Sequence, residues 1–162
     1  MKRRRLHNVI SAVCNTPWLI LPEKLQQIRQ LMALRAQGIR LTTEQVRARI
    51  GAVDAPKLVQ NRSQVAVLNL FGTISHRMNF LSEFSGGTST EQFGKAFDAA
   101  VADPHVSTIV IVADTPGGTV PGVMELSDKI YAARGKKRTI TVVDPMMASA
   151  GLWIGSGSEE VV

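Results

Sequence analysis

Two stretches in the last third of the chain contain residue types that suit acyl-transfer chemistry. Residues 114–119 place Pro-Gly-Gly directly after an apolar, β-branched run, and residues 146–153 place Ser149 between two alanines. Acyl transfer needs a nucleophile and hydrogen-bond donors directed at the oxyanion that the attack creates. A serine hydroxyl beside a glycine turn supplies both parts.

The glycine pair Gly117 and Gly118 is the first candidate for the oxyanion donors. Glycine permits unusual backbone angles, so successive N–H groups can point into one cleft. Taken alone, Pro-Gly-Gly is a weak signal that is more typical of a tight turn between a strand and a helix, and that alternative stays open.

Ser149 is the candidate nucleophile, and the N–H of Ala150 is a further candidate oxyanion donor. Small neighbours allow a sharp backbone turn, and the N-terminus of a following helix adds a positive field. The alternative is a serine in a closely packed helix where alanine and glycine permit tight contact. The order of the two stretches on successive strands favours the catalytic interpretation.

A serine nucleophile also needs a base, and the sequence offers no convincing one. His7 and His105 are expected at the surface, and His76 is expected in a solvated loop, although a role for it stays open. Lys129, Lys136 and Lys137 are expected on a polar face or turn, where burial is too slight to lower a lysine pKa sufficiently. We expect no metal and no cofactor.

Hydrophobic patterning predicts two regions, residues 1–62 and 63–162. In the first, residues 17–50 are predicted to be helical: one helix begins at Pro22 and stops near Gly38, and a capping box at 42–45 opens another that runs to Ile50. Residues 52–62 are predicted to be a linker. The first region contains twelve Lys and Arg against three Asp and Glu, a balance of +9.

In the second region, strands alternate with helices, which predicts parallel crossovers and an α/β fold. Strands are predicted at 65–70, 108–113 and 139–143, with the start of a fourth at 160–162. The strand at 108–113 is expected to be covered on both faces. Helices are predicted from Ser89 to Asp103, around 123–131 and over 147–155, and residues 75–88 are expected to form a loop. Both candidate stretches then follow the carboxyl ends of strands, where α/β sheets place their functional residues.

Composition limits the possible functions. With 44% apolar and 20% charged residues among 162, the chain is typical of a folded globular protein. The basic first region has no aromatic interleaving or nucleic-acid motif, so we expect no nucleic-acid partner. The single cysteine, Cys14, and the absence of a long apolar run indicate a cytoplasmic protein without a membrane span.

Residues 65–162 resemble the signal peptide peptidase A family of serine proteases, most closely its phage branch of head-maturation or capsid assembly proteases. The matching segments are 67–75, 85–90, 114–118 and 148–154, and residues 17–25 are similar to the leader of the phage branch. Two positions depart from the family pattern: Thr115 stands where serine is usual, and Gly151-Leu152 stands where Ala-Tyr is common. The second departure is expected to loosen packing behind the nucleophile.

The resemblance implies stacked ββα units as in Clp-type proteases and crotonases, ring-like homo-oligomers, and a serine–lysine dyad. Ser149 matches the family nucleophile, and the turn at Gly117 and Gly118 matches the oxyanion segment. The family's lysine lies about fifty residues beyond the serine, so residues 63–162 would be the N-terminal part of an incomplete protease domain. The implied substrates are scaffold, capsid and portal proteins in the prohead, within the bacterial host.

Three functions remain open. The first is a capsid assembly protease whose 162-residue part is inactive alone because it lacks the lysine. The second is a truncated, non-catalytic protein that oligomerises or binds scaffold. The third is a crotonase-like acyl-CoA enzyme, which uses the oxyanion donors without a serine nucleophile.

Overall fold

The main sheet has five strands that carry both candidate stretches at one end. A computed structural model describes residues 11, 13–39, 41–50, 59–62, 64–77 and 87–162. The strand order is β2-β3-β6-β8-β9, and all neighbours pair in parallel except β2 and β3, which are antiparallel. The strands are β2 (Val59–Arg62), β3 (Val65–Phe71), β6 (Thr108–Thr115), β8 (Arg138–Met147) and β9 (Glu160–Val161).

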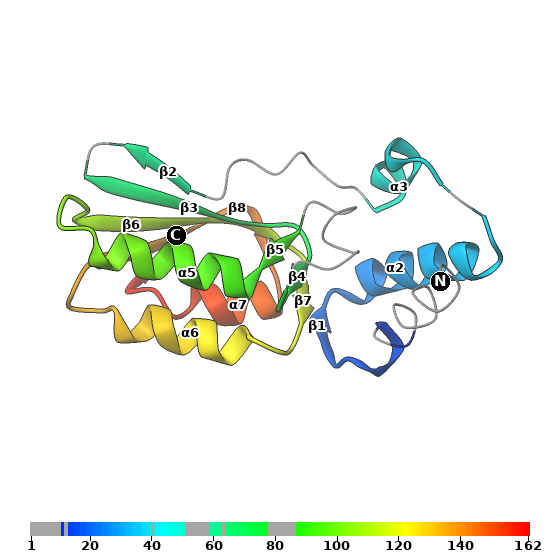
Figure 1. Ribbon diagram of the computed structural model, residues 1–162. Coiled ribbons are helices and arrows are strands. Elements are labelled where there is room, and N and C mark those ends of the chain that lie inside the picture. The colour runs from blue at the N-terminus through cyan, green and yellow to red at the C-terminus, as the bar shows by residue number, and fades with distance from the viewer. Residues whose placement is uncertain (1–10, 12, 40, 51–58, 63, 78–86) are drawn as a thin grey trace.

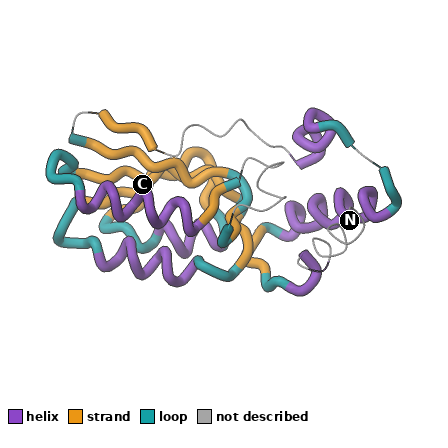
Figure 2. The backbone as a smooth tube through the Cα atoms, viewed as in Figure 1, coloured by secondary structure: helices purple, strands orange, loops and turns teal. Residues whose placement is uncertain are grey.

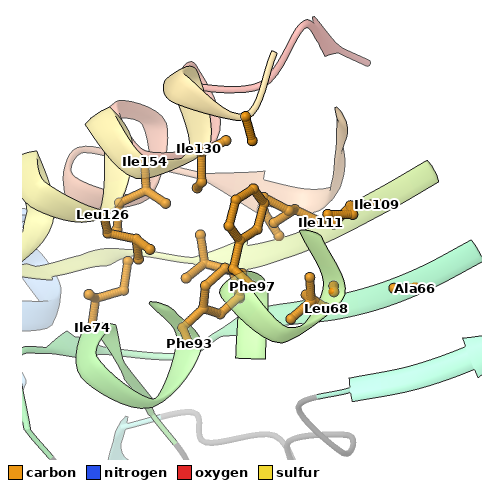
Figure 3. Packing of buried hydrophobic residues seen from close by; sticks show 14 of the residues in the cluster. Ala66, Leu68, Ile74, Phe93, Phe97, Ile109, Ile111, Leu126, Ile130 and Ile154 are labelled. Carbon is orange, nitrogen blue, oxygen red and sulfur yellow. The ribbon is translucent and has the colours of Figure 1, made fainter. Parts of the chain in front are cut away.

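Three helices cover one face of this sheet (Figures 1 and 2). They are α5 (Thr90–Ala102), α6 (Val123–Ala132) and α7 (Ala150–Gly155). Phe93 and Phe97 of α5 are fully buried against Ile109 and Ile111 of β6, together with Ile154 of α7 (Figure 3). The result is the mixed α/β, largely parallel architecture of a ClpP-like fold, as the sequence predicted.

The burial of β6 corrects one expectation. Residues Ile109, Ile111, Ala113 and Thr115 are buried, but the residues between them are only half-buried. The strand is therefore packed on the helix-bearing face and only partly covered on the other. Val, Ile and Ala at consecutive positions hid this alternation, because an apolar run does not reveal which face is packed.

A second, smaller sheet lies where the strands of the main sheet end. It is placed between the main sheet and the helices of the N-terminal arm, residues 11–50 (Figure 1). Its order is β1-β7-β4-β5, with bounds β1 (Trp18–Ile20), β7 (Gly117–Thr119), β4 (Ile74–Ser75) and β5 (Thr88–Ser89). β7 pairs in parallel with β4 and antiparallel with β1. The N-terminal arm thus contributes a strand directly beside the glycine pair.

The arm has its own helices and a small core. α2 (Pro22–Ala36) and α3 (Thr43–Ile50) enclose a cluster of buried side chains, namely Val13, Ile28, Leu31, Met32 and Val46. The predicted capping box is confirmed: the N–H of Gln45 donates to Thr42 Oγ1 at 3.2 Å, and the N–H of Thr42 donates to Gln45 Oε1 at 3.0 Å. Among the described residues, no helix has the length and apolar character needed to cross a bilayer.

The structure differs from the sequence-based expectation at three other places. Residues 18–20 form a strand within the stretch 17–50 that was predicted to be helical, and residues 59–62 of the predicted linker form β2. β1 is defined by β7, a partner about a hundred residues away that local patterning does not reveal. β2 pairs with the adjacent β3, but its sequence Val-Gln-Asn-Arg lacks the β-branched, alternating composition by which a strand is recognised. The last helix begins at Ala150, because β8 continues to Met147. Most of the predicted loop at 75–88 lies outside the described residues.

Candidate active site

The two candidate stretches lie side by side because they follow neighbouring parallel strands. Thr115 at the end of β6 pairs with Met147 at the end of β8. The N–H of Ala148 then donates to the carbonyl of Thr115 at 3.0 Å. This bond fixes the start of the serine turn against the start of the glycine turn.

Ser149 has an unusual backbone. Its φ of 54° and ψ of −112° give the one positive φ outside glycine among the described residues. The residue caps the N-terminus of α7, and the N–H of Gly151 donates to the carbonyl of Ala148 at 2.9 Å to close the turn. A side-chain-bearing residue in such a region costs about 1–3 kcal/mol, and strain of this kind clusters at functional sites. The half-buried serine is therefore held in a sharp strand-to-helix turn.

The glycine pair packs too closely for any side chain. A methyl group on Gly117, whose φ is +98°, would lie 3.1 Å from the Cβ of Ser149. A methyl group on Gly118 would lie 1.9 Å from the carbonyl oxygen of Ile74 in β4. The structure thus brings Gly117 and Ser149 into contact, and it leaves room only for glycine at both positions of the turn.

The N–H groups of the glycine pair are already engaged. The N–H of Gly117 donates to Thr115 Oγ1 at 3.1 Å, and that hydroxyl donates to the carbonyl of Gly72 at 2.6 Å. The N–H of Gly118 faces β1, because Leu19 is its partner in the antiparallel register. Of the two, only Gly118 presents its N–H toward a strand that another chain segment could replace.

The two departures from the family pattern compensate each other in space. A methyl group on Gly151 would lie 2.3 Å from the Cγ2 methyl of Thr115. The Cγ2 methyl group of Thr115 thus occupies the space that the methyl group of an alanine at position 151 would need. The packing behind the serine is filled from β6, contrary to the expectation that it would be loosened.

Charged groups gather beside the glycine turn. Burial raises the pKa of the Asp114 carboxyl, and the negative charge of Asp144 raises it further, while Lys24 opposes this effect. Burial lowers the pKa of the Lys24 ammonium, and the attraction of Asp114 partly offsets that shift. Lys24 belongs to α2 and Asp114 to β6, so these opposite charges connect the arm to the site. Lys24 was not predicted as a site residue, because its neighbours in sequence carry no sign of its partial burial.

The other candidate bases are placed away from the serine turn or are exposed. His76 Nδ1 lies 3.2 Å from Thr90 Oγ1, and His105 is exposed, with its backbone N–H donating to Asp103 Oδ1. Lys129 forms an ion pair with Asp98, and Lys137 donates to two carbonyls in the turn after α5. Lys136 is exposed, and His7 lies outside the described residues.

A hollow of about 270 Å³ lies apart from the serine, between α5 and α6. Its lining includes His76, Glu91, Asp98 and Lys129, charged or polar groups of mixed sign. Neither Ser149 nor the glycine pair lines it. The turn at Ser149 is the better candidate site, because strain, glycine packing and strand ends coincide there.

Comparison with known proteins points in the same direction as this geometry. The chain is 26% identical over 170 residues to the head-tail preconnector protein GP5 of Enterobacteria phage P21. It is 30% identical over 127 residues to the capsid assembly protease C of Escherichia phage lambda. The chain is related to phage capsid maturation proteases.

These matches cover most of the chain but a minor part of each phage protein. The alignments include 95% and 75% of the chain, and 34% and 29% of the respective relatives. The chain therefore spans about a third of the length of these capsid maturation relatives. No protein-family profile matches the chain.

Proposed function

We propose that the chain is the N-terminal part of a serine endopeptidase that cleaves scaffold and other head proteins during phage capsid maturation. The observation that carries this proposal is the strained Ser149 in contact with the glycine turn at the ends of two adjacent parallel strands. The relationship to a capsid assembly protease and a head-tail preconnector protein supports the choice of substrate class.

In the proposed reaction, Ser149 Oγ bonds to the scissile carbonyl carbon and the π electrons of the carbonyl move to its oxygen. The N–H groups of Gly118 and Ala150 then donate to that oxyanion, each contributing about 2.7–4 kcal/mol to transition-state stabilisation. Gly117 was also expected to donate, but its N–H is held by Thr115 Oγ1. We assign Gly117 the different task of letting the turn approach Ser149.

The proton of Ser149 must pass to a base, and we propose a lysine of the longer protein for this step. A neutral lysine amine in an apolar pocket accepts such a proton near pH 7. Among the described lysines, Lys24 has a pKa that burial lowers, but Asp114 partly offsets this shift and is the charged group beside it, and no described contact joins Lys24 to the serine hydroxyl. We therefore expect the 162-residue chain alone to react slowly.

A fluorophosphonate probe tests this assignment by mass spectrometry of the labelled peptide. We expect slow labelling at Ser149 in the 162-residue chain and fast labelling in a version extended at its C-terminus to include the relatives' remaining length. Ser149→Ala must abolish labelling in both, and Lys24→Met must not lower the fast rate. Rapid scaffold cleavage by the 162-residue chain would contradict the external lysine, and an unreactive Ser149 in the extended protein would contradict the peptidase assignment.

A non-catalytic assembly role is the second candidate, favoured by exposed apolar side chains near the site. Leu152 and Trp153 of α7 are 54% and 44% exposed. Inert Ser149 in the extended protein together with a stable multimer, lost on replacing Leu152 and Trp153 by serine, would favour this candidate.

A further inference from the structure

The strand β1 of the arm lies along β7 in the manner of a bound peptide. The register pairs Trp18 with Thr119, Leu19 with Gly118 and Ile20 with Gly117, in antiparallel orientation. At the two ends of this ladder, the N–H of Leu21 donates to the carbonyl of Pro116 at 2.9 Å, and the N–H of Val120 donates to the carbonyl of Pro17 at 3.0 Å. Hydrogen-bonded and non-hydrogen-bonded pairs alternate along an antiparallel ladder. Leu19 and Gly118 therefore form the hydrogen-bonded pair that lies between these two end bonds.

The backbone of Leu19 lies beside the serine. A methyl group built on Gly117 would lie 2.3 Å from the carbonyl oxygen of Leu19 and 3.1 Å from the Cβ of Ser149. The carbonyl oxygen of Leu19 and the Cβ of Ser149 are thus no farther apart than the sum of these two distances. The methyl group built on Gly117 would also lie 3.0 Å from the Cα of Ile20. The Leu19–Ile20 peptide group therefore lies beside Ser149, with its carbonyl oxygen on the side of Gly118.

The side chains of β1 alternate between the two cores. Leu19 packs against the main core, whereas Trp18 and Ile20 pack against the core of the arm. The indole Nε1 of Trp18 also donates to the carbonyl of Val13 at 2.9 Å, which ties that face of β1 to the arm. Leu19 is thus the one residue of β1 whose side chain packs against the main core.

We propose that Pro17–Leu21 is an internal peptide that occupies the substrate strand of the site, and that it must leave β7 before another peptide can bind. The external ligand that fits the same place is an extended peptide with a leucine-like residue at the position of Leu19. Main-chain bonds to β7 provide affinity in this mode of strand addition, and the alternate side chain provides selectivity. This inference rests on the proposed peptidase function for its biological meaning.

The arm is built so that the occupant can leave without unfolding the main domain. β1 has only three residues, and its helix begins at Pro22 immediately after it. Among the described residues, β1 is joined to the main sheet side by the short ladder on β7, the Leu19 side chain and the attraction between Lys24 and Asp114. The five-stranded sheet and its three helices do not depend on β1 for their own pairing.

A peptide copy of residues 15–24, labelled with a fluorophore, tests the proposal in the full 162-residue chain. Leu19→Pro removes the N–H that pairs with Gly118 and should release β1. We expect the peptide to bind Leu19→Pro at least tenfold more tightly than the unchanged chain. Amide exchange at Gly118 and Val120 should become fast in Leu19→Pro and slow again when the peptide is added.

Three controls make the result decisive. A peptide with the same Leu19→Pro change must not bind. A peptide with Leu19→Ala, which keeps the backbone pairing, should bind with an intermediate affinity. A chain with residues 18–20 replaced by Gly-Ser-Gly repeats the test if Leu19→Pro does not fold. Equal affinity for the released and unchanged chains, or unchanged amide exchange, overturns the proposal.

The same experiment separates this inference from the proposed function. Peptide binding does not require a nucleophile, so Ser149→Ala should bind the peptide as the parent does. If the peptide binds the released chain while Ser149 in the extended protein fails to react with a fluorophosphonate, the occupancy of β7 stands and the peptidase function fails. If Ser149 reacts but the peptide shows no preference for the released chain, the peptidase function stands and the occupancy of β7 by Pro17–Leu21 as an internal peptide fails.

Discussion

The turn after β6 and the turn after β8 lie next to each other but achieve their sharp geometry by opposite means. The first uses glycine, so that Gly117 adopts a φ of +98° without a side chain to clash. The second keeps a side chain on Ser149 at a φ of 54°, where any residue with a Cβ is strained. A turn that only has to approach a neighbour is built from glycine, whereas a turn that has to present a hydroxyl retains strain.

The two turns also differ in what surrounds them. The glycine turn is bounded by backbone atoms of β1 and β4, which cannot move without breaking strand pairing. The serine turn is bounded by side chains, such as the Thr115 methyl group that packs against Gly151. Substitutions should therefore be tolerated less in the first turn than in the second.

The largest effect is expected for Gly118→Ala. Its methyl group would lie 1.9 Å from the carbonyl oxygen of Ile74, so β4 and β7 must separate. We expect a loss of about 3 kcal/mol in the free energy of unfolding, as for severe overpacking. Urea denaturation measures it, with Gly94→Ala in α5 as the control, because a methyl group there meets only ordinary contacts at 3.8 Å. Equal stability of the two variants would contradict the difference between the turns.

The next effect concerns Thr115 and Gly151. Gly151→Ala alone should cost about 1–3 kcal/mol by overpacking, and Thr115→Ser alone should cost about 1 kcal/mol by leaving a methyl-sized void. The double variant should be more stable than Gly151→Ala, because serine keeps the hydroxyl bonds to Gly72 and Gly117 and frees the space. A double-mutant cycle measures the coupling, and additive effects would show that the two positions are independent.

A smaller effect of opposite sign is expected when Ser149 loses its strain. Ser149→Gly should be more stable than Ser149→Ala by about 1 kcal/mol, since glycine adopts this backbone freely but loses more entropy on folding. Both variants remove the hydroxyl, so thermal unfolding of the pair isolates the backbone. If alanine is as stable as glycine here, the serine turn is not strained.

The smallest effect is expected from pH at Asp114. Its pKa is raised by burial and by Asp144, so its contribution to stability is fully present below its unfolded pKa and is lost as the pH rises through the folded one. Asp114→Asn should therefore gain stability relative to the parent at pH 7 and match it near pH 3. Urea denaturation at both values measures this, and an advantage that is larger at low pH would contradict the sign of the shift.

Several elements were predictable because the relevant signal is local. The capping box at residues 42–45 and the strands around 65–70 and 108–113 follow from spacing and β-branched runs, and the structure confirms them. The contact between Gly117 and Ser149 was anticipated only through the parallel strand order. The strand at 18–20 was missed because its partner strand is distant in sequence. The strand at 59–62 was missed for a different reason: it pairs with the adjacent strand at 65–68, but three of its four residues are polar.

The sequence by itself determined the alternation of strands and helices, the positions of the glycine pair and the serine, and the related phage family. Only the tertiary structure decided that Thr115 holds the N–H of Gly117, that its methyl group fills the space beside Gly151, and that the backbone of Leu19 lies beside the serine. The physical reason is that spacing along the chain records local periodicity, whereas the contacts of Thr115 with Gly151 and of Leu19 with β7 and the serine join segments that are distant in sequence, in the second case by about a hundred residues or more. Such contacts exist only once the sheets have paired and brought the strand ends together.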